Sequence, residues 1–204
     1  MRTLLFAAAL ALAIPVSAQT QFLVKGGLNT AFFAGEDAGG TEPRLGAVGG
    51  AGLRFNASPA LGVQVEALYS QEGAVEDDGS GTFRLDYLDI PILLRAGLPV
   101  SPYADAGLYA GAQIGIPLNA EFDSEFGDDF DEETLTDIGI ALGGDYWSGA
   151  FGVDLRYVIG LTDTFDDEIN GVFEPLDIRN QTFTVTLGLR FGDTDARPRG
   201  RGRY

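Results

Sequence analysis

The chain of 204 residues contains no histidine and no cysteine. Ser–His and Cys–His nucleophiles and the usual zinc sites depend on these two residues, so those classes of enzyme are excluded. Without cysteine, the chain also lacks disulfides and the acylated cysteine of a lipoprotein. A phosphate-binding loop of the Walker type is missing as well. The sequence therefore predicts a protein that is not an enzyme and needs no cofactor.

Basic residues are also scarce. The chain has 13 lysines and arginines and 30 acidic residues, which gives a formal net charge of −17. Lys25 is the only lysine in the chain. An acidic surface repels the phosphate backbone of DNA or RNA, so nucleic acid is not expected as a partner. Glycine is abundant instead, at 29 residues, which is typical of sheets with sharp curvature and close strand contacts.

Long apolar runs are absent after the first 18 residues. Arg2 is followed by an apolar run that is too short to cross a bilayer as a helix, and Val16-Ser17-Ala18 has the small-x-small pattern of a cleavage site. We interpret residues 1–18 as a signal peptide and expect the mature chain to start near Gln19. If the mature chain enters a membrane, it must do so as a closed barrel, because only closure pairs every backbone group.

Alternation with a period of two dominates the chain from Gln21 onward, which is the pattern of β-strands. Each alternating segment is about as long as the roughly 9–11 residues of a tilted membrane strand, whereas strands of soluble domains have about five or six residues. Strands are predicted at 22–33, 45–55, 61–71, 83–95, 103–118, 135–145, 150–161 and 180–191. Within the fourth segment, Pro91 predicts a bulge or a local bend.

The connections between these segments alternate in length. Long connections are expected at 34–44, 72–82, 119–134 and 162–179, and the others are short. Outer-membrane barrels have this construction, with the long loops outside the cell and the tight turns at the periplasmic end. We therefore predict an all-β fold, an eight-stranded antiparallel up-and-down transmembrane β-barrel over residues 19–192, with both ends of the barrel chain on the turn side.

One face of each predicted strand carries large aliphatic and aromatic residues, and the opposite face carries glycine and charge. Because an eight-stranded barrel is only wide enough inside for packed side chains, we expect the apolar faces to meet lipid. The charges on the other face have both signs and can pair in the lumen, as buried charges require. We interpret them as a structural ion-pair network, with an ion or proton path as the alternative. The predicted set is Lys25, Arg54, Glu66, Asp89, Arg95, Asp105, Asp137, Asp154, Arg156 and Arg190.

Aromatic residues collect near the predicted strand ends, as in the girdles at the two membrane interfaces. Phe22, Trp147, Phe151 and Phe191 are expected in the girdle at the turn end, together with Phe55.

Most of the acidic residues fall in the predicted long connections. Clustered carboxylates in the third of these suit a hard cation such as calcium, but their spacing matches no defined calcium loop, and a solvated acidic loop is the simpler interpretation. The cation candidates are Asp128, Asp129, Asp131 and Glu132, and no other metal site is expected. The basic segment 193–204 lacks any apolar period and is expected to be a disordered tail.

Several stretches resemble the PorT-like outer-membrane β-barrel family, which is common among Bacteroidota. These stretches are GGLNTAFF in the first segment, YLDIPILLR in the fourth, YADAGLYAGAQIG in the fifth, LRYVIGLTD in the seventh and NQTFTVTLGLRF in the last. The most specific is YLDIPILLR, with Pro91 at the family's proline position. The resemblance implies an eight-stranded outer-membrane barrel without catalytic residues, and the basic tail departs from its pattern.

Three functions are consistent with these features. The first is a non-enzymatic barrel in the outer membrane of a Gram-negative-type bacterium, serving envelope structure, surface interaction or secretion as an accessory. The second is a narrow porin-like channel for small solutes or ions, and the third is a soluble periplasmic barrel that binds an apolar ligand. For the first, the expected partners are outer-membrane lipid and divalent cations at the loops, and the expected state is a monomer.

Overall fold

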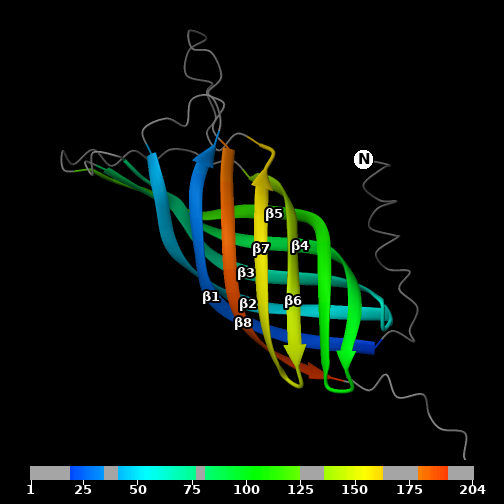
Figure 1. Ribbon diagram of the computed structural model, residues 1–204. Coiled ribbons are helices and arrows are strands. Elements are labelled where there is room, and N and C mark those ends of the chain that lie inside the picture. Colours follow the sequence, from blue (N-terminus) through cyan, green and yellow to red (C-terminus); the bar gives the residue numbers. More distant parts are fainter. Residues whose placement is uncertain (1–18, 35–40, 77–80, 125–135, 163–178, 193–204) are drawn as a thin grey trace, which may run out of the picture.

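The fold is a closed barrel of eight antiparallel strands in which each strand pairs with its neighbours in sequence and β1 pairs with β8 (Figure 1). The computed structural model describes residues 19–34, 41–76, 81–124, 136–162 and 179–192. The strands are β1 Gln19–Ala34, β2 Thr41–Ser58, β3 Leu61–Glu76, β4 Gly81–Ser101, β5 Ala104–Ser124, β6 Asp137–Ser148, β7 Phe151–Gly160 and β8 Arg179–Gly192. The predicted fold class is thus confirmed.

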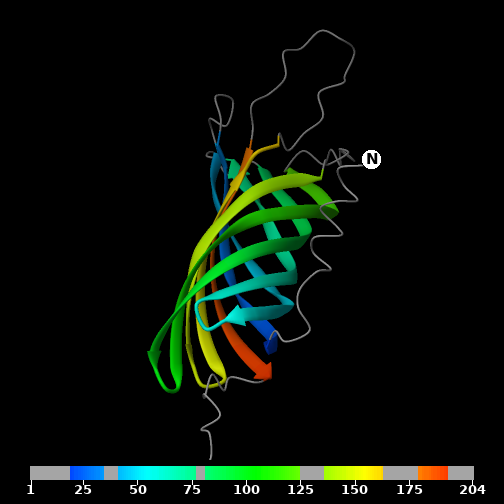
Figure 2. The same cartoon turned by 90° about the vertical axis from the view of Figure 1, so that its right-hand side faces the viewer.

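Both ends of the barrel chain lie on the turn side. Figure 1 shows the start of β1 and the end of β8 at the same end of the barrel as the tight β4–β5 and β6–β7 turns, and the strands lean across the barrel as they rise towards the other end (Figure 2). The β6–β7 turn consists of Gly149 and Ala150 only, and Gly149 has a φ of 58°. Such a left-handed conformation favours glycine, which explains this residue at the turn.

Side chains alternate between the two sides of the wall along every strand, as the sequence predicts. On the outside, Leu28, Leu108 and Leu187 are 54%, 68% and 67% exposed, whereas the charged Lys25 and Arg156 are buried inside. Phe22 and Phe191 lie side by side on the outer face at the turn end, with their ring centroids 6.3 Å apart. An outer surface this apolar is unsuited to water and suited to hydrocarbon. Within the described residues, no helix is long and apolar enough to cross a membrane.

Several strands are longer than the sequence predicts. Pairing of β4 with β5 continues to Gly81 and Ser124, and each of these strands has 21 residues. Pairing continues because backbone hydrogen bonds do not require apolar side chains, whereas the alternating pattern fades where the strands leave the apolar belt. The predicted connections at 72–82 and 119–134 are therefore too long, and Glu72 belongs to β3 rather than to a loop.

Of the bulge or local bend predicted at Pro91, the bulge is absent. Pro91 is opposite Gln113 of β5, and the register changes elsewhere along that pair of strands. On the other side, β3 and β4 keep one register across this point, although the pairing skips Glu66 and Ala67. The missing N–H of proline removes a ladder hydrogen bond, and here the flanking pairs hold the strands in register without an extra residue.

Candidate functional site

The lumen is the candidate site, because it contains almost all the buried charge of the described residues. Eight predicted lumen side chains are buried, namely Lys25, Arg54, Glu66, Asp89, Arg95, Asp154, Arg156 and Arg190. Asp105 and Asp137 are half-buried. The charges form three groups along the barrel axis, which we call the turn-end cluster, the central cluster and the loop-end cavity.

The turn-end cluster consists of Arg54, Arg95, Asp105, Asp145 and Arg190. The Asp145 carboxylate on β6 accepts hydrogen bonds from Arg54 Nη2 of β2 at 2.5 Å and from Arg95 Nη2 of β4 at 2.6 Å. Asp105 on β5 accepts from Arg95 Nη2 at 2.8 Å and from Arg190 Nη1 of β8 at 2.5 Å. Five strands are thereby joined across the lumen at the turn end.

Trp147 fills the space between two arginines of this cluster. The guanidinium carbons of Arg54 and Arg190 each lie 5.4 Å from the Trp147 ring, which is a cation–π distance. Trp147 has no exposed surface. The prediction that it belongs to the membrane girdle is therefore wrong. Trp147 shares its side of β6 with Asp145, so it points into the lumen, and Tyr146 points outward at 47% exposure.

The central cluster consists of Lys25, Glu66, Tyr109, Asp154 and Arg156. Lys25 Nζ lies 2.6 Å from Glu66 Oε1 and 3.0 Å from Asp154 Oδ2. Arg156 Nη2 lies 2.6 Å from Glu66 Oε2 and 3.8 Å from Asp154 Oδ1. The Tyr109 hydroxyl donates to Asp154 at 3.0 Å. Two cations and two carboxylates thus balance each other's charge within the barrel.

Gln64 joins the two clusters into one network. Its Oε1 accepts from Arg54 Nε at 2.7 Å, and its Nε2 donates to Glu66 Oε1 at 2.5 Å. Both polar atoms of this buried side-chain amide are therefore hydrogen-bonded, one to each cluster. The network extends without a break from the turn end to the middle of the lumen.

Glycines on neighbouring strands make room for the large lumen side chains. Tyr109 is directly opposite Gly143 of β6, and Trp147 is directly opposite Gly152 of β7. A Cβ atom at either glycine would overlap the facing ring. Aromatic side chains that cover a glycine on the next strand are a known device for fixing register in curved sheets. The glycine-rich inner face therefore makes space for the network.

Asp89 and Asp137 are not brought into this network. They lie in the loop-end cavity, and the ion pairs among the described residues include neither of them. Asp137 instead accepts a hydrogen bond from Thr162 at 2.9 Å. The prediction that both would be satisfied by pairing is wrong, because the lumen cations reach only the turn-end and central levels.

Sequence reasoning missed Asp145 and Glu72 as members of the lumen. Asp145 is an even number of positions from Asp137 on the same strand, and Glu72 follows Glu66 and Ser70 in steps of two. The alternation was therefore sufficient to find both. Glu72 was lost because the predicted strand ended one residue before it.

Other predicted features lie outside the described residues. These are the signal peptide at 1–18, the tail at 193–204 and the cation candidates Asp128, Asp129, Asp131 and Glu132. Within the described part of the chain, no group of three or more acidic side chains is close enough to hold a metal ion directly.

The position of Trp147 leads to a fluorescence prediction. Because Trp147 is the only tryptophan and lies inside the wall, brominated lipid chains are expected to leave its emission almost unchanged. Introducing Phe151→Trp on the outer face at the turn end, where Phe151 is 71% exposed, is expected to add a component that the bromines quench. Strong quenching of the unmodified protein would instead place Trp147 in the membrane girdle.

Comparison with known proteins identifies the family of this barrel. Residues 17–166 match the family described as outer membrane protein beta-barrel domain. The chain belongs to this family. Membership of the outer membrane barrel family assigns the apolar outer face to the lipid of a Gram-negative outer membrane and leaves the lumen network inside the wall.

One solved structure, Neisserial surface protein A, supports the same fold. The match to Neisserial surface protein A has 14% sequence identity and a TM-score of 0.52, covering 83% of this chain and 97% of that one. The match to Ail, the attachment invasion locus protein of Yersinia pestis, has 15% identity and a TM-score of 0.48, covering 85% and 99%. At these identities, the likeness concerns the fold alone. Among curated proteins, nothing matches the chain.

Proposed function

We propose that this outer membrane barrel is a non-enzymatic protein that acts through the surface it presents to the outside, in envelope structure, surface interaction or as an accessory to secretion. The PorT-like motifs, above all YLDIPILLR around Pro91, support a place near that branch of the barrel proteins. We further propose a monomer that is exported by a cleaved signal peptide, contacts outer-membrane lipid and has no nucleic-acid partner.

The observation that carries this proposal is the closed lumen. Asp145 holds Arg54 and Arg95 from two other strands, Asp105 holds Arg95 and Arg190, and Trp147 is packed between Arg54 and Arg190. Eight strands enclose only enough space for side chains, and here charged and aromatic side chains occupy it at two levels. A solute would have to break several buried ion pairs to pass, so the functional surface is the exterior.

The structure disfavours a soluble barrel with an apolar ligand. Such a protein would need its apolar residues inside, but Leu108 and Leu187 point outward. The interior contains paired charges, which offer an apolar ligand no favourable contact.

Electrical recording in planar bilayers tests the proposal against the channel alternative. We expect the purified full-length protein to insert without conductance steps, because the turn-end cluster blocks the lumen. The double variant Arg95→Ser with Asp145→Ser shortens two blocking side chains and is expected to conduct if it inserts. Stable unitary currents from the unmodified protein, altered by that double variant, would show that the lumen is a pathway and overturn the proposal.

A further inference from the structure

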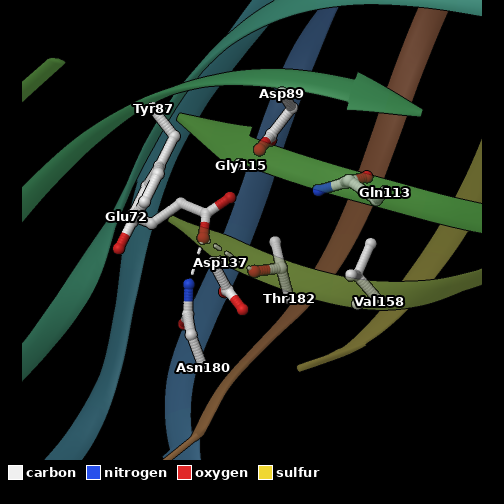
Figure 3. A pocket seen from close by; sticks show the side chains of 10 residues that line it. Glu72, Tyr87, Asp89, Gln113, Gly115, Asp137, Val158, Asn180 and Thr182 are labelled. Carbon is white, nitrogen blue, oxygen red and sulfur yellow. Dashed lines mark hydrogen bonds between the residues drawn. The ribbon is translucent and has the colours of Figure 1, made fainter. Parts of the chain in front are cut away.

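The loop-end cavity is lined by acidic side chains that form no ion pair with the cations of the lumen network. It lies near the long-loop end of the barrel and is lined by residues of β3, β4, β5, β6, β7 and β8 (Figure 3). Glu72, Asp89 and Asp137 line it from three different strands, together with Tyr87, Gln113, Asn180 and Thr182. The space open to the centre of a water-sized molecule is about 10 Å³.

None of the three carboxyl groups forms an ion pair with a cation of the described residues. The ion pairs of the described residues engage Lys25 and Arg156 with Glu66 and Asp154, one level deeper in the lumen. Glu72 and Asp89 are 4% and 6% exposed. Like charges held together away from bulk water repel strongly and require a countercharge or a proton.

Neutral donors hold Glu72 in one orientation. Its Oε1 accepts from Ser70 Oγ at 2.7 Å, and its Oε2 accepts from Thr182 Oγ1 at 3.1 Å and from Asn180 Nδ2. Figure 3 shows Asn180 and Thr182 reaching the Glu72 carboxylate from β8. Hydrogen-bond donors of this kind favour the ionised carboxylate over the protonated one. These donors therefore fix the orientation of the Glu72 carboxyl group without supplying a countercharge.

Two buried oxygen atoms of the cavity lining have no partner. The Tyr87 hydroxyl and Asn180 Oδ1 make no hydrogen bond with the protein, although Tyr87 is 1% and Asn180 3% exposed. The Asn180 oxygen can only accept a hydrogen bond or ligate a cation. Buried polar atoms without partners are rare in native proteins and commonly mark an ion or a water molecule. This observation does not depend on the unpaired carboxyl groups, and it too indicates a bound ion or water molecule in the cavity.

We infer that the loop-end cavity binds one small divalent cation, together with part of the cation's water shell. The polar groups of its lining are carboxyl, hydroxyl and amide groups, and oxygen ligands are those of hard cations such as Ca²⁺ and Mg²⁺. The enclosed volume has room for one water-sized occupant. Since no three acidic groups of the described residues can hold a metal directly, bound water completes the coordination. A charge of two rather than one is favoured because three carboxyl groups line the same cavity.

Calorimetric titration of the refolded full-length protein with CaCl₂ tests this inference. We expect the double variant Glu72→Gln with Asp89→Asn to lose one Ca²⁺ site or to weaken it at least tenfold. The control removes four negative charges from the third predicted connection through Asp128→Asn, Asp129→Asn, Asp131→Asn and Glu132→Gln, and is expected to keep that site. MgCl₂ is expected to compete, whereas NaCl at equal ionic strength is expected to have little effect.

A conservative variant separates binding from folding. Tyr87→Phe removes one unpartnered oxygen, retains the ring and leaves all three carboxylates in place, so it is expected to fold and to weaken Ca²⁺ binding several-fold. Unchanged binding in both cavity variants, with loss in the loop control, would assign the cation to the loop and overturn the inference. Absence of any Ca²⁺ site, or equal displacement by NaCl, would overturn it as well.

Discussion

Asp145→Ala is expected to lower the free energy of unfolding by about 3–5 kcal/mol, the usual cost of removing one partner of a buried ion pair. The Asp145 side chain has no exposed surface and accepts hydrogen bonds from both Arg54 and Arg95. Its removal leaves two guanidinium groups that have lost their shared anion inside the wall. Urea unfolding of the refolded barrel in micelles, followed by the mobility difference between folded and boiled protein on gels, measures the loss.

Two control variants show how the loss of stability depends on the burial of the removed carboxylate. Asp105→Ala removes the other carboxylate of the turn-end cluster, but the Asp105 side chain is 28% exposed, so water compensates Arg95 and Arg190 in part and a smaller loss is expected. Glu42→Ala, at an exposed position of β2, is expected to change stability by less than about 0.5 kcal/mol. An Asp145→Ala protein as stable as Glu42→Ala would contradict a buried, paired Asp145.

A double replacement identifies the cause of the loss. If unbalanced buried charge is responsible, Arg54→Met combined with Asp145→Leu is expected to recover much of the stability, because apolar side chains of similar volume replace buried ion pairs at little net cost. Arg95 retains Asp105 in that protein. If the double variant were less stable than Asp145→Ala alone, packing around Trp147 would be the dominant contribution instead.

The inward and outward faces of each strand could be predicted from the sequence because the two sides of the barrel wall have opposite environments. Lipid outside and a packed polar interior impose a strict alternation, and that alternation fixes which side of the wall Lys25 or Leu108 faces. The alternating loop lengths then fix the up-and-down order. Neither inference needs a contact between distant residues, so one sequence was sufficient.

The pairing inside the lumen could not be predicted in the same way. Whether Asp89 meets an arginine depends on strand tilt and register, which decide the level that each inward residue occupies along the axis. Asp89 and Arg95 share one face of β4, yet Arg95 reaches Asp105 and Asp145 whereas Asp89 lies beside Glu72 in the loop-end cavity. The set of inward-facing charged residues therefore predicts that a network exists, but it does not predict which residues pair with which.

Val185→Arg is expected to cost about 2–4 kcal/mol, which is typical of a basic residue on the lipid face at the bilayer midplane. Val185 points outward at 40% exposure, near the middle of β8. Its pairing partners Leu28 and Leu155 lie near the middle of β1 and β7. The three side chains thus define the centre of the apolar belt. Ile140→Arg on β6 and Leu108→Arg on β5 provide further outward positions for the same measurement.

The dependence on depth separates a lipid-facing wall from a general intolerance of charge. Leu61 begins β3 at the turn end and is 47% exposed, so Leu61→Arg places its charge close to the headgroups, where a cost of about 0–1 kcal/mol is expected. Unfolding in lipid vesicles and the yield of heat-modifiable protein compare the two positions directly. If Val185→Arg and Leu61→Arg had equal costs, or if the Val185 variant remained soluble and folded without detergent, the outer face would not be in contact with hydrocarbon.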